Sequence, residues 1–201
     1  MQSLRDITVV IISRDRNETL ARTLLYWSSL AINVVVLHNA NIPLSTSLIP
    51  KNVKYVLSNG NFGERCKLAS DYIKTPFAIL SSDDEVFLPE ALFKLRQELE
   101  ADEKLISVGG QTLAIGCYGN DLTYYLPYGF NKDYRNLEEE PLNRLYNHFD
   151  QKVGYRNGSM YRLMRSYFFQ DMLECFSEVS FFNTPYIYEI TGEFLVNSYR
   201  R

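Results

Sequence analysis

The sequence contains few cysteines. Cys66, Cys117 and Cys175 are the three present in 201 residues, and no pair of them has CxxC spacing. Isolated thiols of this kind argue against a disulfide framework and against a zinc knuckle, and they favour a reducing compartment. We therefore expect a cytoplasmic chain, or one that lies peripherally at the inner face of a membrane.

The sequence also lacks an excess of basic charge and a long apolar run. It carries 21 Lys and Arg against 24 Asp and Glu, a net charge of −3. Proteins that bind duplex nucleic acid normally present a basic face, so we expect no nucleic-acid partner. No apolar run reaches the roughly 18 residues that a transmembrane segment needs. Residues 1–6 lead directly into a strand pattern, so we expect no signal peptide.

The first half of the chain alternates short β-branched runs with segments of helical periodicity. The runs, which we expect to be strands, are residues 7–12, 33–37, 53–57, 77–80 and 107–113. The expected helices are residues 18–30, with Asn17 as N-cap, residues 62–73, and a helix that begins at Pro89. This alternation predicts an α/β fold of the Rossmann-like type, with a mostly parallel central sheet and helices on both faces.

The second half has less periodicity. Residues 118–134 are rich in Gly, Asn, Asp and Tyr, which indicates a long loop or an irregular hairpin. We expect helices at residues 141–149, 166–175 and 186–190, and strands at residues 161–164 and 194–199. His148 is expected on a helix surface; the alternative is a late metal ligand.

No linker rich in Pro, Gly or Ser divides the chain. We therefore expect one domain over residues 1–201, with a ligand-binding half (1–115) and an acceptor or lid half (116–201). Because the sequence ends directly after an expected strand, it is open whether the chain is one module of a longer protein.

Polar segments follow the first four expected strands, at residues 13–16, 38–41, 58–61 and 81–85. Ligands of open α/β sheets bind beyond the carboxyl ends of the strands, so these segments predict a site at one edge. The last segment holds three consecutive acids, Asp83, Asp84 and Glu85. Adjacent carboxylates repel unless a cation lies among them, and Mg²⁺ binds one or two carboxylates together with substrate phosphates. The alternative is that the acids cap the helix that begins at Pro89.

Three blocks of the sequence, in this order, resemble motifs of family 2 glycosyltransferases, which have the GT-A fold of the nucleotide-diphospho-sugar transferase superfamily. Residues 13–20 (SRDRNETL) resemble the opening Asn-Arg-x-x-x-Leu motif, and residues 61–67 (NFGERCK) resemble an Asn-x-Gly-x-x-x-Arg helix start. Residues 82–92 (SDDEVFLPEAL) resemble the Asp-x-Asp segment and its following Pro-x-x-Leu. The match covers about residues 7–113, with weaker signals at 161–165 and 190–193.

The resemblance implies a nucleotide-diphosphate sugar donor, a divalent cation (Mg²⁺ or Mn²⁺), and transfer of the sugar to a hydroxyl of a glycan or another acceptor. The positions that it assigns to donor binding are Ser13, Asp15, His38, Asn39, Arg65, Ser82 and Asp83. It makes Asp84 the principal metal ligand. Two residues depart from the family pattern, because His38 stands where an Asp usually contacts the base and Ser82 replaces the first Asp of the metal motif.

Transfer to a hydroxyl also needs a general base, since the acceptor loses its proton as it attacks the anomeric carbon. Inverting members of the family use a carboxylate late in the domain. The candidates in this sequence are Glu178, Glu189 and Asp171, and we prefer Glu178, which we expect on a loop. Candidate cations for the leaving diphosphate are Arg156, Arg162 and Arg165. Residues 124–128 form either an aromatic acceptor platform or a packed loop.

Two other functions stay open. A catalytically weak glycosyltransferase-like domain that binds a glycan or a partner would accommodate the departures at His38 and Ser82. A sugar-nucleotide pyrophosphorylase shares the sheet but normally has a glycine-rich loop after the first strand, which residues 13–17 lack. An Asp84 side chain turned away from every cleft, or neutralised by a structural arginine, would argue against the metal-dependent enzyme.

Overall fold

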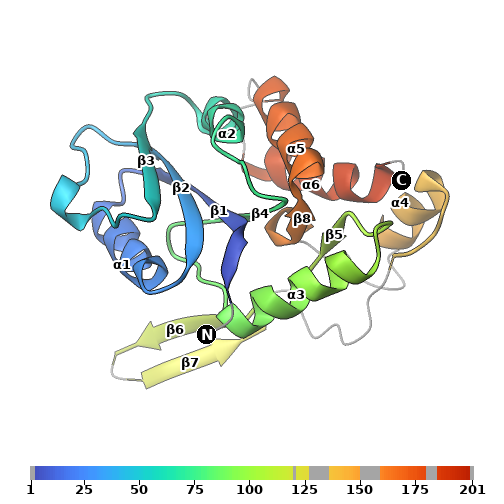
Figure 1. Cartoon of the computed structure of the whole chain (residues 1–201), viewed down its shortest axis with the longest axis horizontal. Coiled ribbons are helices and arrows are strands. Elements are labelled where there is room, and N and C mark those ends of the chain that lie inside the picture. Colours follow the sequence, from blue (N-terminus) through green and yellow to red (C-terminus); the bar gives the residue numbers. More distant parts are fainter. Residues whose placement is uncertain (1–2, 120, 127–135, 150–158, 180–184, 200–201) are drawn as a thin grey trace.

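The computed structural model describes residues 3–119, 121–126, 136–149, 159–179 and 185–199. Its centre is a six-stranded sheet with the strand order β3-β2-β1-β4-β8-β5 (Figure 1). The strands of this sheet are β1 (Leu4–Arg14), β2 (Ile32–Asn39), β3 (Val53–Leu57), β4 (Phe77–Ser81), β5 (Ser107–Val108) and β8 (Leu163–Arg165). A separate hairpin pairs β6 (Ala114–Tyr118) with β7 (Asp121–Tyr125).

The strands β1 to β4 run parallel, whereas β8 pairs antiparallel with both β4 and β5. From β1 the chain adds β2 and β3 on one side and then returns to add β4 on the other. The strand order therefore reverses between β1 and β4, which is the place where open α/β sheets form a ligand crevice at their carboxyl ends. The loops that follow β1 and β4 meet at this point.

Helices cover both faces of the sheet (Figure 1). They are α1 (Asn17–Ser28), α2 (Phe62–Ser70), α3 (Pro89–Ala101), α4 (Pro141–Phe149), α5 (Ser166–Glu178) and α6 (Pro185–Ser198), with short 3₁₀ turns at Thr46–Leu48 and Ser159–Tyr161. One apolar core joins the sheet to α1 and α3, and a second joins its other face to α2, α5 and α6. Val9 and Val10 of β1 are both fully buried, one on each face of the sheet. This is why the sequence of the strand is a nearly continuous apolar run.

The predicted fold class is confirmed, and the first four strands lie where the sequence predicts them. The expected cap of α1 is wrong: Asn17 is the first helical residue, and its side-chain amide donates to the Ile42 carbonyl at 3.0 Å. Helix α2 ends three residues before the expected 73. The acids after β4 do not cap α3, whose N-cap is Leu88, without a side-chain hydrogen bond.

The second half departs further from expectation. Residues 194–199 are not a strand, because residues 194–198 continue α6, in which Tyr188, Val196 and Asn197 are buried at helical spacing. A short apolar run looks the same in a strand and in a buried helix, so periodicity cannot separate the two. The strand expected at 107–113 shortens to β5, and the loop or hairpin expected at 118–134 begins earlier, as the regular β6–β7 pair; residues 127–135 lie outside the described part.

His148 is not on a helix surface as expected. It is 1% exposed, and its Nε2 lies 2.8 Å from a carboxylate oxygen of Glu193, itself buried in α6. Beside this pair, the buried Arg144 donates to the main-chain oxygens of Asn197, Glu138, Glu139 and Tyr199. We call Arg144, His148, Glu193 and Asn197 the closed cluster, which joins α4 to α6.

Across the described residues, no helix combines the length and the hydropathy that crossing a bilayer requires.

Candidate functional site

The loops after β1 and β4 are joined by a buried hydrogen bond. Ser13 ends the buried part of β1, and its hydroxyl donates to Oδ2 of Asp83 at 2.6 Å. The main-chain oxygen of Asp83 accepts from the Thr23 hydroxyl of α1 at 2.5 Å. Two donors from different elements thus hold Asp83, which is 2% exposed, at the reversal point of the sheet.

An arginine joins this aspartate to its neighbour. Nη1 of Arg16 lies 2.7 Å from Oδ1 of Asp83, and Nη2 lies 2.7 Å from Oδ2 of Asp84. The Asp83 side chain is 3% exposed, whereas the side chains of Arg16 and Asp84 are 48% and 49% exposed. We call Ser13, Arg16, Asp83 and Asp84 the open cluster, because two of its three charged side chains reach the surface.

The backbone before Arg16 is held in an uncommon conformation. Asp15 has φ of 52°, in the left-handed region, and its N–H donates to the Asn39 carbonyl at 2.9 Å. A non-glycine residue in this region costs free energy and recurs at functional sites. The turn sets Arg16 at the N-cap of α1, from which its side chain reaches the β4–α3 loop.

The charges of the open cluster stabilise one another. Burial acts to raise the pKa of Asp84, but the hydrogen bonds from Arg16 and Ser82 and the positive charge of Arg16 outweigh it, so that this pKa lies below its ordinary value. The hydrogen bond to Asp84 is also the main cause of the raised pKa of Arg16. Both groups are therefore charged at neutral pH.

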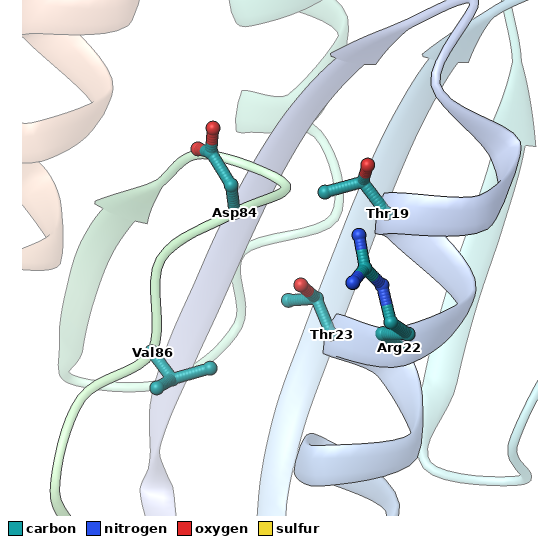
Figure 2. A pocket seen from close by; sticks show the side chains of 5 residues that line it. All are labelled: Thr19, Arg22, Thr23, Asp84 and Val86. Atoms are coloured by element: carbon teal, nitrogen blue, oxygen red, sulfur yellow. The ribbon is translucent and has the colours of Figure 1, made fainter. Parts of the chain in front are cut away.

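A pocket of about 280 Å³ opens beside Asp84. Thr19, Arg22 and Thr23 of α1 face Asp84 and Val86 of the β4–α3 loop across it (Figure 2). The pocket thus combines an arginine, two hydroxyls and a carboxylate. Arg16 and Arg22 are not among the candidate residues that the sequence indicates, although both belong to the segment between β1 and the middle of α1.

His38 and Asn39 lie at the end of β2, next to β1. His38 is fully buried; its Nδ1 is 2.7 Å from the Tyr55 hydroxyl, and its Nε2 has no hydrogen-bond partner among the described residues. Burial lowers the pKa of His38, and the nearby charge of Arg65 lowers it further. The Asn39 amide donates to the Gly60 carbonyl at 3.2 Å.

Arg65 of α2 is 4% exposed, and its recorded hydrogen bonds go to main-chain oxygens. It donates to the carbonyls of Ser13, Asn61 and Leu37, at the ends of β1 and β2 and at the start of its own helix. Burial lowers its pKa. This positive charge at the carboxyl edge therefore holds the strand ends together.

The residues on either side of Asp83 and Asp84, Ser82 and Glu85, bond to each other. The Ser82 N–H donates to the Glu85 carboxylate at 3.3 Å. Glu85 thus closes the turn after β4 and leaves Asp84 as the exposed acid beside the pocket.

Glu178 is not on a loop as expected, because it is the last residue of α5, and this end of the helix packs against the start of α2. A Cβ added at Gly63 would lie 2.3 Å from the main-chain oxygen of Phe176, so only glycine permits this approach. Because α2 follows β3, the contact brings the exposed Glu178 toward the carboxyl edge. Glu189 lies in α6, and its side chain is outside the described set; Asp171 is exposed on α5, where it accepts from the Tyr199 hydroxyl at 3.2 Å.

The remaining predicted site residues are the candidate cations for the diphosphate and the aromatic residues of the segment 124–128. Arg165 donates to the carbonyls of Leu99, Leu105 and Asp102, so it fastens the end of α3 to β8. Arg156 lies outside the described residues. Tyr124 and Tyr125 lie on β7 and are 76% and 59% exposed, so this part of residues 124–128 is not a packed loop.

A divalent cation fits the chemistry of Asp84, because Mg²⁺ and Mn²⁺ prefer carboxylate oxygens. No three His, Cys, Asp or Glu side chains gather into a metal site in the part of the chain that the structure describes. Water and ligand phosphates would have to complete the shell, as they commonly do for Mg²⁺. Asp84 faces the pocket but is paired with Arg16, a half-exposed arginine, so its role as a metal ligand stays a prediction.

Comparison with known proteins gives no family. No family model matches the sequence, and no curated protein matches it. Similar solved structures include two of TarS from S. aureus. The first is 13% identical over 83% of this chain and 29% of that chain, with a TM-score of 0.49. The second is 16% identical over 82% of this chain and 48% of that chain, with a TM-score of 0.45.

A third similar structure is the CMP:2-keto-3-deoxy-manno-octonic acid synthetase complexed with CTP. It is 13% identical over 86% of this chain and 78% of that chain, with a TM-score of 0.38. The chain thus spans less than half the length of the TarS chains that it resembles. At these identities and TM-scores, the similarities carry no inference about what this chain binds.

Proposed function

We propose that this chain is a glycosyltransferase that moves a sugar from a nucleotide-diphosphate donor to a hydroxyl acceptor, with inversion at the anomeric carbon. The observation that carries the proposal is the open cluster itself. Ser13 and Arg16 come from one motif-like block, Asp83 and Asp84 come from another about seventy positions later, and the four side chains meet where the strand order reverses. This is where ligands bind in open α/β sheets.

The donor would lie across the ends of β1, β2 and β4. In this arrangement the residues at the end of β2, His38 and Asn39, and the turn residue Asp15 lie on the base side, whereas Ser82 and Asp84 lie on the diphosphate side. Arg22 and the Thr19 hydroxyl of the pocket add donors that suit phosphate oxygens, whereas the Thr23 hydroxyl is taken by the Asp83 carbonyl. A divalent cation, held by Asp84 when it is bound, would neutralise charge that develops on the leaving diphosphate.

The acceptor hydroxyl attacks the anomeric carbon while the bond from that carbon to the diphosphate oxygen breaks. The proton of the hydroxyl passes to a carboxylate. Glu178 is our first candidate for this base, because the close approach of α5 and α2 at Gly63 brings its helix end to the carboxyl edge. Glu189 is the second, because Phe62 at the start of α2 packs against its neighbour Tyr188, with ring centroids 4.6 Å apart.

The proposal is tested with a panel of UDP-, GDP- and CDP-sugars, with and without Mn²⁺. We expect at least one donor to raise the melting temperature, and slow hydrolysis of that donor to release its nucleoside diphosphate. If no donor shifts the melting temperature under either condition, the proposal is wrong.

One observation favours a second candidate, a domain that binds a glycan without transferring sugar. Tyr124 and Tyr125 are exposed on opposite faces of the β6–β7 hairpin, and aromatic rings suit the C–H faces of sugars. The same panel separates the candidates, because donor hydrolysis belongs to the enzyme alone.

A further inference from the structure

The buried carboxylate of the open cluster has both of its oxygens in use. Oδ1 of Asp83 is 2.7 Å from Arg16, and Oδ2 accepts from Ser13 at 2.6 Å. The side chain is 3% exposed, so no water replaces a lost partner without rearrangement. Because the side chain is buried behind these two donors, a metal ion would reach an oxygen of Asp83 only if one of them moved aside.

Asp84 differs because it is half exposed and lines the pocket. Its Oδ2 is 2.7 Å from Nη2 of Arg16. A divalent cation that approached Asp84 from the pocket would therefore meet the positive charge of this guanidinium at short range. The cation and the guanidinium would be neighbours at the same two carboxylates, where like charges repel.

Although the buried Asp83 then needs another cation in its place, Arg16 can leave Asp84 without disturbing the core. Its side chain is 48% exposed, and its backbone is fixed independently, by the turn at Asp15 and by the start of α1. The pair of Arg16 with Asp84 is half exposed, and such pairs contribute little to folding, so its loss is tolerated. The closed cluster offers no such freedom, because Arg144 is 4% exposed and bonded to four carbonyls.

We propose that Arg16 and a divalent cation compete for the carboxylates of Asp83 and Asp84, so that the cation binds tightly only when the guanidinium has left them. The proposal rests on the proposed function, which gives Asp84 its role as metal ligand. Arg16 then serves as a resident counter-ion of the empty site, and its charge becomes available to the donor diphosphate once a cation takes its place.

The test is Mn²⁺ binding without any nucleotide, followed by electron paramagnetic resonance, in the intact chain and in Arg16→Gln. We expect Arg16→Gln to bind Mn²⁺ about tenfold more tightly or better, a difference of about 1.4 kcal/mol or more. Arg14→Gln is the matched control, because Arg14 is a neighbouring arginine, 74% exposed, whose recorded ion pair is with Asp15 at 3.7 Å. It should bind Mn²⁺ as the intact chain does.

Two further variants sharpen the test. Arg16→Lys keeps the charge but loses the fork that spans two carboxylates, so its Mn²⁺ affinity should be intermediate. Arg16→Gln combined with Asp84→Asn should lose the gained affinity, which assigns the gain to this site. Equal Mn²⁺ affinity in the intact chain and Arg16→Gln, or no Mn²⁺ binding by either, overturns the proposal.

Failure here is distinguishable from failure of the proposed function. The Mn²⁺ titration uses no donor, so an absent response to nucleotide sugars leaves its result intact. Conversely, the outcome can be a chain that binds and hydrolyses a donor but has the same Mn²⁺ affinity with and without Arg16. That result would support the proposed function and overturn the proposed competition between Arg16 and the cation.

Discussion

The closed cluster and the open cluster both centre on an arginine that joins segments distant in the sequence, but they differ in exposure. Arg144 is 4% exposed and donates to four main-chain oxygens beside the buried His148–Glu193 pair. Arg16 is half exposed and contacts two carboxylates, one of which lines a pocket. The first arrangement is closed to ligands and serves packing, whereas the second leaves charge available for binding. The difference predicts a large loss of stability when Arg144 is substituted and a smaller loss when Arg16 is substituted.

Substitution of Arg144 should have the largest effect on stability. Arg144→Met removes the donor to the carbonyls of Asn197 and Tyr199 and to two carbonyls of the segment before α4, and each carbonyl left unpaired away from water costs free energy. We expect the free energy of unfolding to fall by about 3 kcal/mol or more, measured by urea denaturation. A loss as small as that of an exposed ion pair would mean that the cluster is not closed.

Ser13→Ala should have an intermediate effect. It leaves Oδ2 of the buried Asp83 without its recorded donor, and we expect a loss of about 1–2 kcal/mol in urea denaturation. Ser28→Ala is the matched control, since the Ser28 hydroxyl bonds locally to the Leu25 carbonyl on the surface. Equal losses in the two variants would contradict the role given to the Ser13–Asp83 bond.

The pH dependence of stability should reveal the protonation of His38, which lies at the end of β2. Burial, followed by the charge of Arg65, holds its folded pKa below the ordinary 6.5, so the unfolded chain takes up the proton first. The stability that His38 contributes as a buried neutral group is complete above about pH 6.5. This stability is lost as the pH falls from there toward the lowered pKa, by no more than about 1.4 kcal/mol per pH unit.

His38→Asn should therefore flatten the decline in stability between about pH 6.5 and pH 5, as followed by urea denaturation at several pH values. The groups that face His38 are Tyr55, Arg65, Asp15 and Asp83, of which the two acids oppose the shift. An unchanged decline in the variant would show that His38 is not the titrating group.

Arg16→Gln should cost less stability than Arg144→Met, about 1–2 kcal/mol: the half-exposed pair with Asp84 contributes little, and the loss comes from Oδ1 of the buried Asp83, which keeps its bond from Ser13 through Oδ2. The same urea denaturation that detects the loss in Arg144→Met would measure it. A loss comparable to that of Arg144→Met would make Arg16 a structural arginine and remove the contrast between the clusters.

The sequence predicts the first half of the fold well because its signals are local. Strands β1 to β4 are runs of apolar residues that end in polar segments, and Pro89 marks the start of α3. The second half depends on tertiary contacts that no local pattern reveals. His148 carries no sign in the sequence that Glu193 faces it, and residues 194–199 follow a pattern that serves either a strand or a helix.

The candidate site likewise has some features that are visible in the sequence and others that depend on tertiary contacts. The position of Asp83 and Asp84 after a strand is visible in the sequence, but the pairing of both with Arg16 is not, because it depends on how two loops meet. The sequence likewise points to Arg65 as a charged residue at a helix start, whereas its burial against main-chain carbonyls follows from the packing of α2 on the ends of β1 and β2.

The affinity of an Asp84→Asn variant for the nucleoside diphosphate part of the donor tests the central claim most directly. Isothermal titration with the nucleoside diphosphate of the responding donor, in the presence of Mn²⁺, should show affinity about tenfold weaker or worse than in the intact chain, with an unchanged free energy of unfolding. Equal affinity in the two proteins would contradict the claim that the open cluster at the β1–β4 reversal is where the donor binds.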